Sequence, residues 1–230
     1  MRMTPSYSSW IPLALGAVLS LASCGGTQRP PAEPSPAPAS QGEAAAIAKA
    51  RADSLRYPYT KADVEFMSHM IGHHAQALVM ADWAPSHGAS PSVQTLAGRI
   101  INGQQDEIAT MQRWLRDRRQ PVPEASARMK MKMKMNGREH EMLMPGMLTE
   151  DQMRQLDQAR GPEFDRLFLT FMIQHHRGAV TMVNDLLASR GAARDETVFK
   201  FSNDVSVDQS TEIARMEKML AGMGPGAGSP

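Results

Sequence analysis

The fold of this chain is decided by DVEFMSHMIGHHAQALVMA at residues 63–81, which returns as DRLFLTFMIQHHRGAVTMV at residues 165–183. A second pair of similar segments follows, QQDEIATMQRWL at 104–115 and QSTEIARMEKML at 209–220. The offset is 102 residues for the first pair and 105 for the second, so the second copy has the longer internal connection. Such repetition indicates one supersecondary unit that occurs twice and packs against its own copy.

Each copy has the periodicity of two helices, and residues that suit helix ends flank them. The four predicted helices begin at the caps Thr60 (with Asp63), Ser90–Pro91, Pro162 and Asp195, and end near Trp83, Arg116, Arg190 and Ala221. Thr149 with Gln152 predicts a short extra helix that ends near Gly161, and residues 43–56 can add another. No convincing strand pattern appears. We therefore predict an all-α, ferritin-like four-helix bundle made of two duplicated helical hairpins.

The N-terminus has the features of an export signal. Arg2 precedes an apolar stretch at 11–22, which is too short to span a bilayer comfortably and ends in Leu21-Ala22-Ser23-Cys24. This ending looks like a bacterial lipobox, which predicts a signal peptide at 1–23 and a lipidated Cys24; the alternative is a lone core cysteine. Gly25, rather than Asp, follows the cysteine, and by resemblance to Gram-negative sorting patterns this favours the outer membrane.

These features predict the order of the domains. A Pro/Ala/Ser-rich tether at 24–42 leads to a tandem-repeat domain at 43–221, with repeats at about 60–116 and 162–221, a Met-rich linker at 117–148 and a flexible tail at 222–230. The mature protein is expected in the cell envelope, anchored by lipid and facing the periplasm. The formal charge of +1 gives no reason to expect a nucleic-acid partner.

The pattern Met-x-x-His-His-x-x-x-x-x-Met occurs in both copies, on the apolar face of each first helix or at its margins. A buried imidazole needs a partner for each nitrogen or loses about 1–3 kcal/mol, so two such pairs indicate ligands. Alternatively, Glu107 and Glu212, or Gln104 and Gln209, satisfy the histidines as structural partners. The candidate metal ligands are His69, Met70, His73, His74, Met80, Met172, His175, His176 and Met182; Phe171 stands where the first copy has His69.

The ligand types indicate which metal is bound. Thioethers select mainly Cu(I), while imidazole suits copper, zinc, iron and nickel. The single cysteine excludes a thiolate cluster, and His and Met survive an oxidising compartment. We therefore expect copper, with Cu(I) favoured and Cu(II) also compatible.

The linker adds MKMKMKM at 129–135, an alternation that places the Met side chains on one face of an extended chain. The intervening lysines oppose a bound cation, and Met also serves as adaptable packing. The possible secondary ligands are Met129, Met131, Met133, Met135, His140, Met142, Met144 and Met147. The nearby Arg113, Arg116, Arg118 and Arg119 are expected to form a solvated helix end.

Together, the two HH motifs, the QxxEI-type helices and Met144-Pro145-Gly146-Met147 resemble a bacterial family known as domain of unknown function 305, over about residues 59–221. The resemblance implies a ferritin-like four-helix bundle, often exported, with an association with copper binding or tolerance in some members. By the same resemblance, the Met and His of the two HH motifs are the positions to carry over.

Three functions remain open at this point. The first is an exported lipoprotein that binds copper for buffering, tolerance or delivery to a partner that the sequence does not identify. The second is a membrane-tethered structural or interaction module whose histidines are structural. The third is a ferritin-like oxidase, which we expect least because such sites need Glu-x-x-His spacing and neither HH motif has a Glu three residues before either histidine. We therefore expect a protein that is not an enzyme; the oligomeric state stays open.

Overall fold

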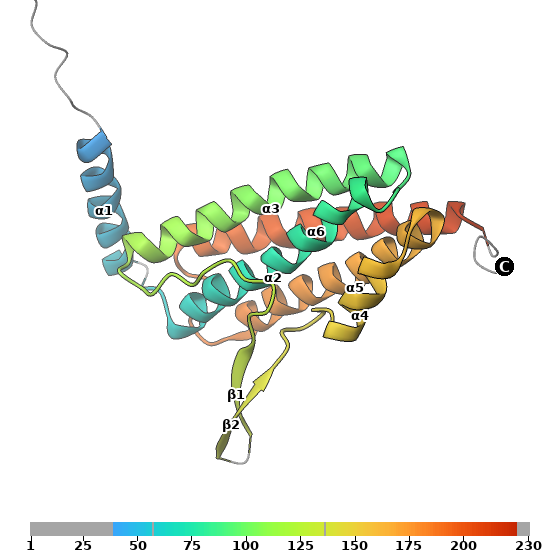
Figure 1. Cartoon of the computed structure of the whole chain (residues 1–230). Coiled ribbons are helices and arrows are strands. Elements are labelled where there is room, and N and C mark those ends of the chain that lie inside the picture. Colours follow the sequence, from blue (N-terminus) through green and yellow to red (C-terminus); the bar gives the residue numbers. More distant parts are fainter. Residues whose placement is uncertain (1–38, 57, 136, 225–230) are drawn as a thin grey trace, which may run out of the picture. The chain divides into compact units, whose positions relative to one another are not determined.

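The computed structural model describes residues 39–56, 58–135 and 137–224, and most of the described residues are helical (Figure 1). The predicted signal peptide, Cys24, most of the tether and the last six residues lie outside this part. No described helix is both long and apolar enough to cross a membrane. The elements are α1 (Ala39–Arg56), α2 (Lys61–Ser86), α3 (Pro91–Asp117), β1 (Met131–Met135), β2 (Arg138–Met142), α4 (Glu150–Gln158), α5 (Gly161–Ala188) and α6 (Glu196–Gly222).

The helix starts follow the capping residues in the sequence. Thr60 and Asp63 form a capping box at α2, and Ser90 accepts a hydrogen bond from the Val93 backbone at α3. Asp195 caps α6 by accepting from the backbone of Thr197 and Val198. A second capping box, between Thr149 and Gln152, begins α4.

One helix end differs from its prediction. Helix α2 continues past Trp83 to Ser86 and includes Pro85, where a connection was expected. A proline so close to the end removes few helical hydrogen bonds, and Ala84 beside it is fully buried. The turn is completed beyond Pro85 by the His87 and Ala89 N–H groups, which donate to the Trp83 and Ala84 carbonyls at 3.0 and 3.1 Å.

The four long helices pack as two hairpins, α2 with α3 and α5 with α6, joined where α2 packs against α5 (Figure 1). Two hydrophobic clusters lie along this arrangement. One cluster, called the hairpin-side cluster because it lies beside the β1–β2 hairpin, joins the start of α2 to the end of α5 through Phe66 and Leu186. The opposite cluster joins the end of α2 to the start of α5, through Ala84 and Phe164. Helices α2 and α5 therefore run antiparallel, as expected for two copies of one unit.

The duplicated aspartates tie each copy to the other. Asp63 on α2 accepts a hydrogen bond of 2.7 Å from the Ala193 backbone, in the connection between α5 and α6. Its counterpart Asp165 on α5 accepts from the Ser90 backbone at 3.1 and 3.2 Å, in the connection between α2 and α3. Each repeat thus supplies the carboxylate that satisfies the connection of the other repeat.

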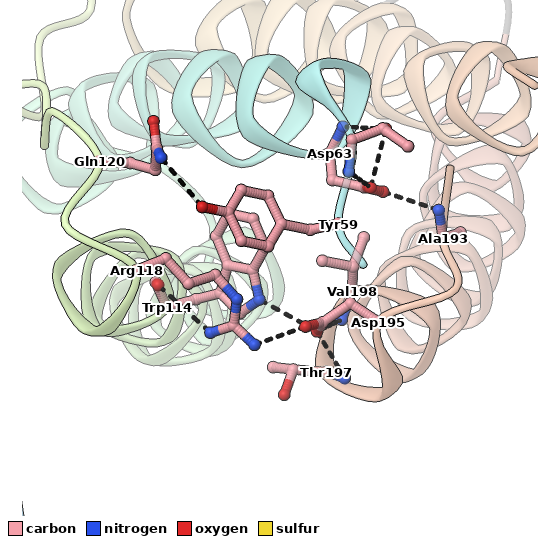
Figure 2. A network of polar contacts seen from close by, with 10 residues as sticks. Tyr59, Asp63, Trp114, Arg118, Gln120, Ala193, Asp195, Thr197 and Val198 are labelled. Carbon is pink, nitrogen blue, oxygen red and sulfur yellow. Dashed lines mark hydrogen bonds and ion pairs between the residues drawn. The ribbon is translucent and has the colours of Figure 1, made fainter. Parts of the chain in front are cut away.

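A buried polar network joins α3 to α6 at one end of the molecule (Figure 2). Asp195 accepts from the Trp114 indole at 3.0 Å and from Arg118 at 2.5 Å, and the Arg118 guanidinium lies 4.4 Å from the Trp114 ring. The expectation that Arg118 belongs to a solvated helix end is therefore wrong. Its side chain is 5% exposed, because a buried carboxylate and an aromatic face compensate its desolvation.

The linker also departs from the prediction, because it contains strands. β1 and β2 form an antiparallel hairpin in which Met131 pairs with Met142 and Met133 with His140. Alternating Met and Lys satisfy the twofold periodicity of a strand although neither residue type is a strong strand former. The expectation of no strand is wrong for these two short segments.

Candidate metal centre

The four histidines of the HH motifs meet in the interior, where α2 packs against α5. His73, His74, His175 and His176 are all 0% exposed. The rings of His73 and His175, one from each repeat, lie 3.8 Å apart between centroids. The rings of His74 and His176 follow at 6.3 and 6.2 Å from their chain neighbours. The duplication therefore gathers four imidazoles from distant parts of the sequence into one buried group.

The outer two histidines have matched carboxylate partners from the second helix of each repeat. His74 Nε2 donates to Glu107 of α3 at 2.5 Å, and His176 Nε2 donates to Glu212 of α6 at 2.6 Å. Of the partners that the sequence suggested, the glutamates rather than the glutamines make these contacts. A carboxylate behind an imidazole fixes the orientation of the ring and its tautomer, as in the outer shell of many metal sites.

The inner two histidines donate to backbone carbonyls instead. His73 Nε2 bonds the carbonyl of Pro145 at 2.9 Å, and His175 Nε2 bonds the carbonyl of His73 at 3.0 Å. A carbonyl oxygen can only accept, so in both rings Nε2 carries the proton. In the neutral ring, Nδ1 then carries a lone pair that is free to accept a hydrogen bond or bind a metal ion.

None of the four Nδ1 atoms has a hydrogen-bond partner, although all four are buried. His87, the other buried histidine of the described chain, provides a contrast. Its Nδ1 lies 2.9 Å from the Ser86 hydroxyl and its Nε2 lies 2.9 Å from the Asp157 carbonyl, so both nitrogens have partners. Since buried polar atoms are normally satisfied, four unpaired buried Nδ1 atoms, two of them on the close His73 and His175 rings, are compatible with a soft or borderline metal ion.

Burial keeps the inner rings neutral. Desolvation, and then the proximity of His74, lower the pKa of His73 to about 3. Desolvation, and then the charge that His73 would carry, hold the pKa of His175 well below its usual value. A neutral imidazole is the form that binds a metal.

The four methionines of the motifs flank the histidines symmetrically. Met70 and Met182 belong to the hairpin-side cluster, and Met80 and Met172 belong to the opposite cluster. Three of them are fully buried, while Met182 is 9% exposed. Each pair combines one thioether from each repeat.

His69 lies outside the buried group, in a pocket beside Met131, Met144 and Met182. The rest of the predicted secondary set is dispersed. Met147 is buried in the hairpin-side cluster. Met129 packs on α2, Met142 and His140 are exposed, and the side chains of Met133 and Met135 lie outside the described part.

The carbonyl that contacts His73 is placed by a close approach of two glycines. A Cβ on Gly178 of α5 would lie 2.0 Å from the Pro145 oxygen, and one on Gly146 would lie 2.6 Å from the Gln174 carbonyl. Gly146 also has a φ of 75°, which favours glycine. Sequence reasoning did not assign this contact. The signal was the Pro145-Gly146 pair in the linker together with Gly178, two residues after His176.

The chemistry open to the site is limited by the ligands present. Within residues 39–56, 58–135 and 137–224, no three His, Cys, Asp or Glu side chains are grouped so as to hold one metal ion. A carboxylate-rich centre does not match this arrangement. The arrangement does match a soft ion that needs only a few neutral ligands, here imidazole nitrogens with thioethers nearby.

The chain is similar to one described family and to several solved structures. The family described as domain of unknown function (DUF305) matches residues 63–220. A DUF305 fragment from Deinococcus radiodurans is 28% identical, with a TM-score of 0.57 over 71% of this chain and 97% of that one. CopM in its Cu(II)-bound form is 28% identical, with a TM-score of 0.54 over 70% of this chain and 97% of that one. CopM in its Cu(I)-bound form is 27% identical, with a TM-score of 0.53 over 71% and 98%. No curated protein sequence matches the chain.

Proposed function

The chain belongs to the family described as domain of unknown function (DUF305), and from that premise we propose that it binds copper through buried histidines of its two HH motifs. Solved structures of the related CopM hold Cu(I), Cu(II) and Ag. Cu(I) is the favoured ion here because the nearby donors are soft and neutral; Cu(II) is the alternative.

The observation that carries the proposal is the set of four buried, unpartnered Nδ1 atoms. The Nε2–H groups donate to Glu107, Glu212 and two carbonyls, so each ring keeps its lone pair on Nδ1. His73 and His175, whose rings lie 3.8 Å apart, would hold the ion through Nδ1, and the thioethers of Met70, Met80, Met172 and Met182 are the additional donors. Copper supplies no reaction in this proposal; it is the cargo.

The wider role proposed is buffering, tolerance or delivery of copper in the cell envelope. The supporting feature is the lipobox-like sequence that ends at Cys24, outside the described residues. It would anchor a ferritin-like bundle to a membrane on its periplasmic side, where a partner could take the ion. We assign no enzymatic reaction to the site.

A structural role for the histidines is the competing function. It accounts for the four Nε2 contacts, and His87 is an example of a histidine satisfied in that way. It leaves four buried Nδ1 atoms unpaired, each at a cost of about 1–3 kcal/mol. Metal binding accounts for both ring nitrogens.

The test is a Cu(I) titration of the full-length chain against a colorimetric Cu(I) chelator. Cys24 is replaced by Ser in every sample, because a free thiol would itself bind Cu(I). The variant is His73→Gln with His175→Gln, since glutamine keeps an N–H donor while it removes the imidazole lone pair. The matched control is His87→Gln, at a buried histidine whose nitrogens are both paired.

We expect the double variant to lose the tightest class of bound Cu(I), while His87→Gln retains it. Circular dichroism and thermal melting check that the variants remain folded. Equal Cu(I) binding by the double variant and the parent would refute the proposal and leave the structural function.

A further inference from the structure

A second group of soft donors lies at a pocket of about 160 Å³ between the base of the β-hairpin and the α2–α5 pair. His69 comes from α2, Met131 from β1, Met144 from the segment after β2, and Met182 from α5. Four separate segments therefore bring one imidazole and three thioethers to the same pocket. We propose that this pocket is a surface site for a monovalent soft ion, Cu(I) or Ag(I), distinct from the buried histidines.

The segment that leads into β1 holds the base of the β-hairpin against α2. A Cβ on Gly72 would lie 2.5 Å from Met129 Cβ, so the absence of a side chain there allows Met129 to pack directly on the helix. Side chains two residues apart share a face of an extended chain. Met131 therefore also turns toward the helices, and it packs against the hairpin-side cluster.

The other side of the hairpin base is held against α5. Met142 pairs with Met131 in the hairpin, and Met144 follows two residues later, 2% exposed. The next two residues, Pro145 and Gly146, lie against Gly178 on α5. The two thioethers of the linker are thus held by close contacts on both helices, the Met129 side chain on Gly72 of α2 and the Pro145–Gly146 backbone on Gly178 of α5, rather than carried on a free loop.

The donors suit a soft cation that comes from solvent. Thioether and imidazole are neutral ligands that select Cu(I) over the hard cations, and burial lowers the pKa of His69, which keeps it available as a ligand. Glu65 and Asp185 also line the pocket and supply negative charge near its donors. Glu65 pairs with the exposed Lys61 at 2.8 Å, and an exposed pair of this kind leaves the carboxylate accessible to water.

Packing is the alternative explanation for these methionines, since Met fills irregular gaps. It explains the burial of Met144 but not the half-exposed His69 beside three thioethers in an open pocket. Pro145 lines this pocket and its carbonyl also accepts the hydrogen bond from His73. The surface site therefore adjoins the buried histidines through one residue, but it does not require them to bind copper.

The test compares Met131→Leu with Met144→Leu, as a double variant, against Met142→Leu. Leucine conserves the volume of methionine and removes the thioether, so the fold should survive. Met142 is the matched control because it lies on the same hairpin, is 42% exposed and is not among the residues of the pocket. All variants are made in the full-length chain with Cys24→Ser, and Ag(I) and Cu(I) are titrated separately.

We expect the double variant to bind one class of ion at least about 10-fold more weakly, because loss of an outer-shell partner alone weakens a metal site about 10- to 100-fold and two ligands are removed here. Met142→Leu should match the parent. Methyl-labelled methionine NMR gives a direct readout: the methyl signals of Met131 and Met144 should shift with Ag(I), and that of Met142 should not.

Two outcomes would overturn the proposal. One is unchanged binding in the double variant; the other is loss of every bound ion in a variant that remains folded, which would mean a single shared site. The His73→Gln, His175→Gln variant separates this proposal from the buried site, because it should keep the class of ion that the double methionine variant loses.

Discussion

The two ends of the α2–α5 seam have the same motif but different surroundings. At the β-hairpin end, His69 and the slightly exposed Met182 line an open pocket together with linker residues. At the opposite end, Phe171 replaces His69, and Met80, the counterpart of Met182, is 0% exposed within the opposite cluster. Duplication thus reproduces the buried histidines, whereas the linker, which occurs once, lines a pocket at one end only with Met131, Met144 and Pro145.

The connections within the two helical hairpins differ in the same way. Ser90 begins α3 with a single hydroxyl cap, whereas Asp195 begins α6 and also binds Trp114 and Arg118 (Figure 2). Each connection also receives a duplicated aspartate from the other repeat. The copied carboxylates therefore provide similar support at both ends, and the Arg118–Asp195 pair adds support at one end only.

This difference predicts the largest effect on stability. Asp195→Ala should lower the free energy of unfolding by about 3–5 kcal/mol, because it leaves the buried Arg118 charge unpaired. Asp165→Ala should cost only about 1–3 kcal/mol, because it leaves one backbone N–H, that of Ser90, without its acceptor. Urea denaturation of both variants measures the two values. Equal losses would mean that the ion pair adds nothing to the end that contains it.

The next largest effect concerns the linker. Gly178→Ala should destabilise the protein by about 1–3 kcal/mol, because the new methyl group would lie 2.0 Å from the Pro145 oxygen and must push the linker away. The control is Gly98→Ala on α3, where nothing lies within 4 Å of the added carbon. That change should stabilise the helix by about 0.5–1 kcal/mol. Thermal melting compares them, and a stable Gly178→Ala variant would show that the linker is loosely placed.

Most of the helical fold could be predicted from sequence because its determinants are local or repeated. The caps at Thr60, Ser90 and Asp195 are set by residues within one turn, and the copied HH motifs indicate the seam between α2 and α5. Burial of the histidines follows from their place on the apolar stripe. These features need no knowledge of distant contacts.

The rest depends on contacts between segments far apart in the chain. Arg118 looks like a solvated charge until Asp195, 77 residues away, is placed beside it. The Pro145 carbonyl that contacts His73 is likewise set by the approach of Gly146 to Gly178. Glu107 could be named as a histidine partner only as one of two possibilities, because the rotation of α3 decides between Glu107 and Gln104.

A third prediction tests whether the inner histidines of the two repeats are equivalent. Burial lowers the pKa of His73 to about 3 and that of His175 well below the ordinary value of 6.5, so the unfolded chain binds protons first as pH falls. The metal-free protein should therefore lose stability below about pH 6.5, approaching about 1.4 kcal/mol per pH unit for each histidine. His73→Gln and His175→Gln should each reduce this slope by a similar amount. Urea unfolding between pH 7 and 5.5, with a chelator present, measures it; an unchanged slope in either variant would contradict the assignment.

The smallest effect is expected from a substitution that makes the β-hairpin end of the α2–α5 seam resemble the opposite end. His69→Phe gives the first repeat the residue that the second has at Phe171. Because His69 is only half-buried, the free energy of unfolding should change by less than about 1 kcal/mol. Cu(I) or Ag(I) binding at the pocket should weaken by about 10-fold rather than disappear, since the three thioethers remain.

The control for that change is His140→Phe, at an exposed histidine on β2 that is not among the residues of the pocket. Chelator competition in the Cys24→Ser background compares the two variants. If both bind like the parent, the imidazole of His69 is not a ligand and the opening holds only thioethers. If only His69→Phe weakens ion binding, the imidazole of His69 is a ligand at the β-hairpin end. The opposite end has Phe171 at the equivalent position and a fully buried Met80, so the difference between His69 and Phe171 then accounts for ion binding at one end of the seam.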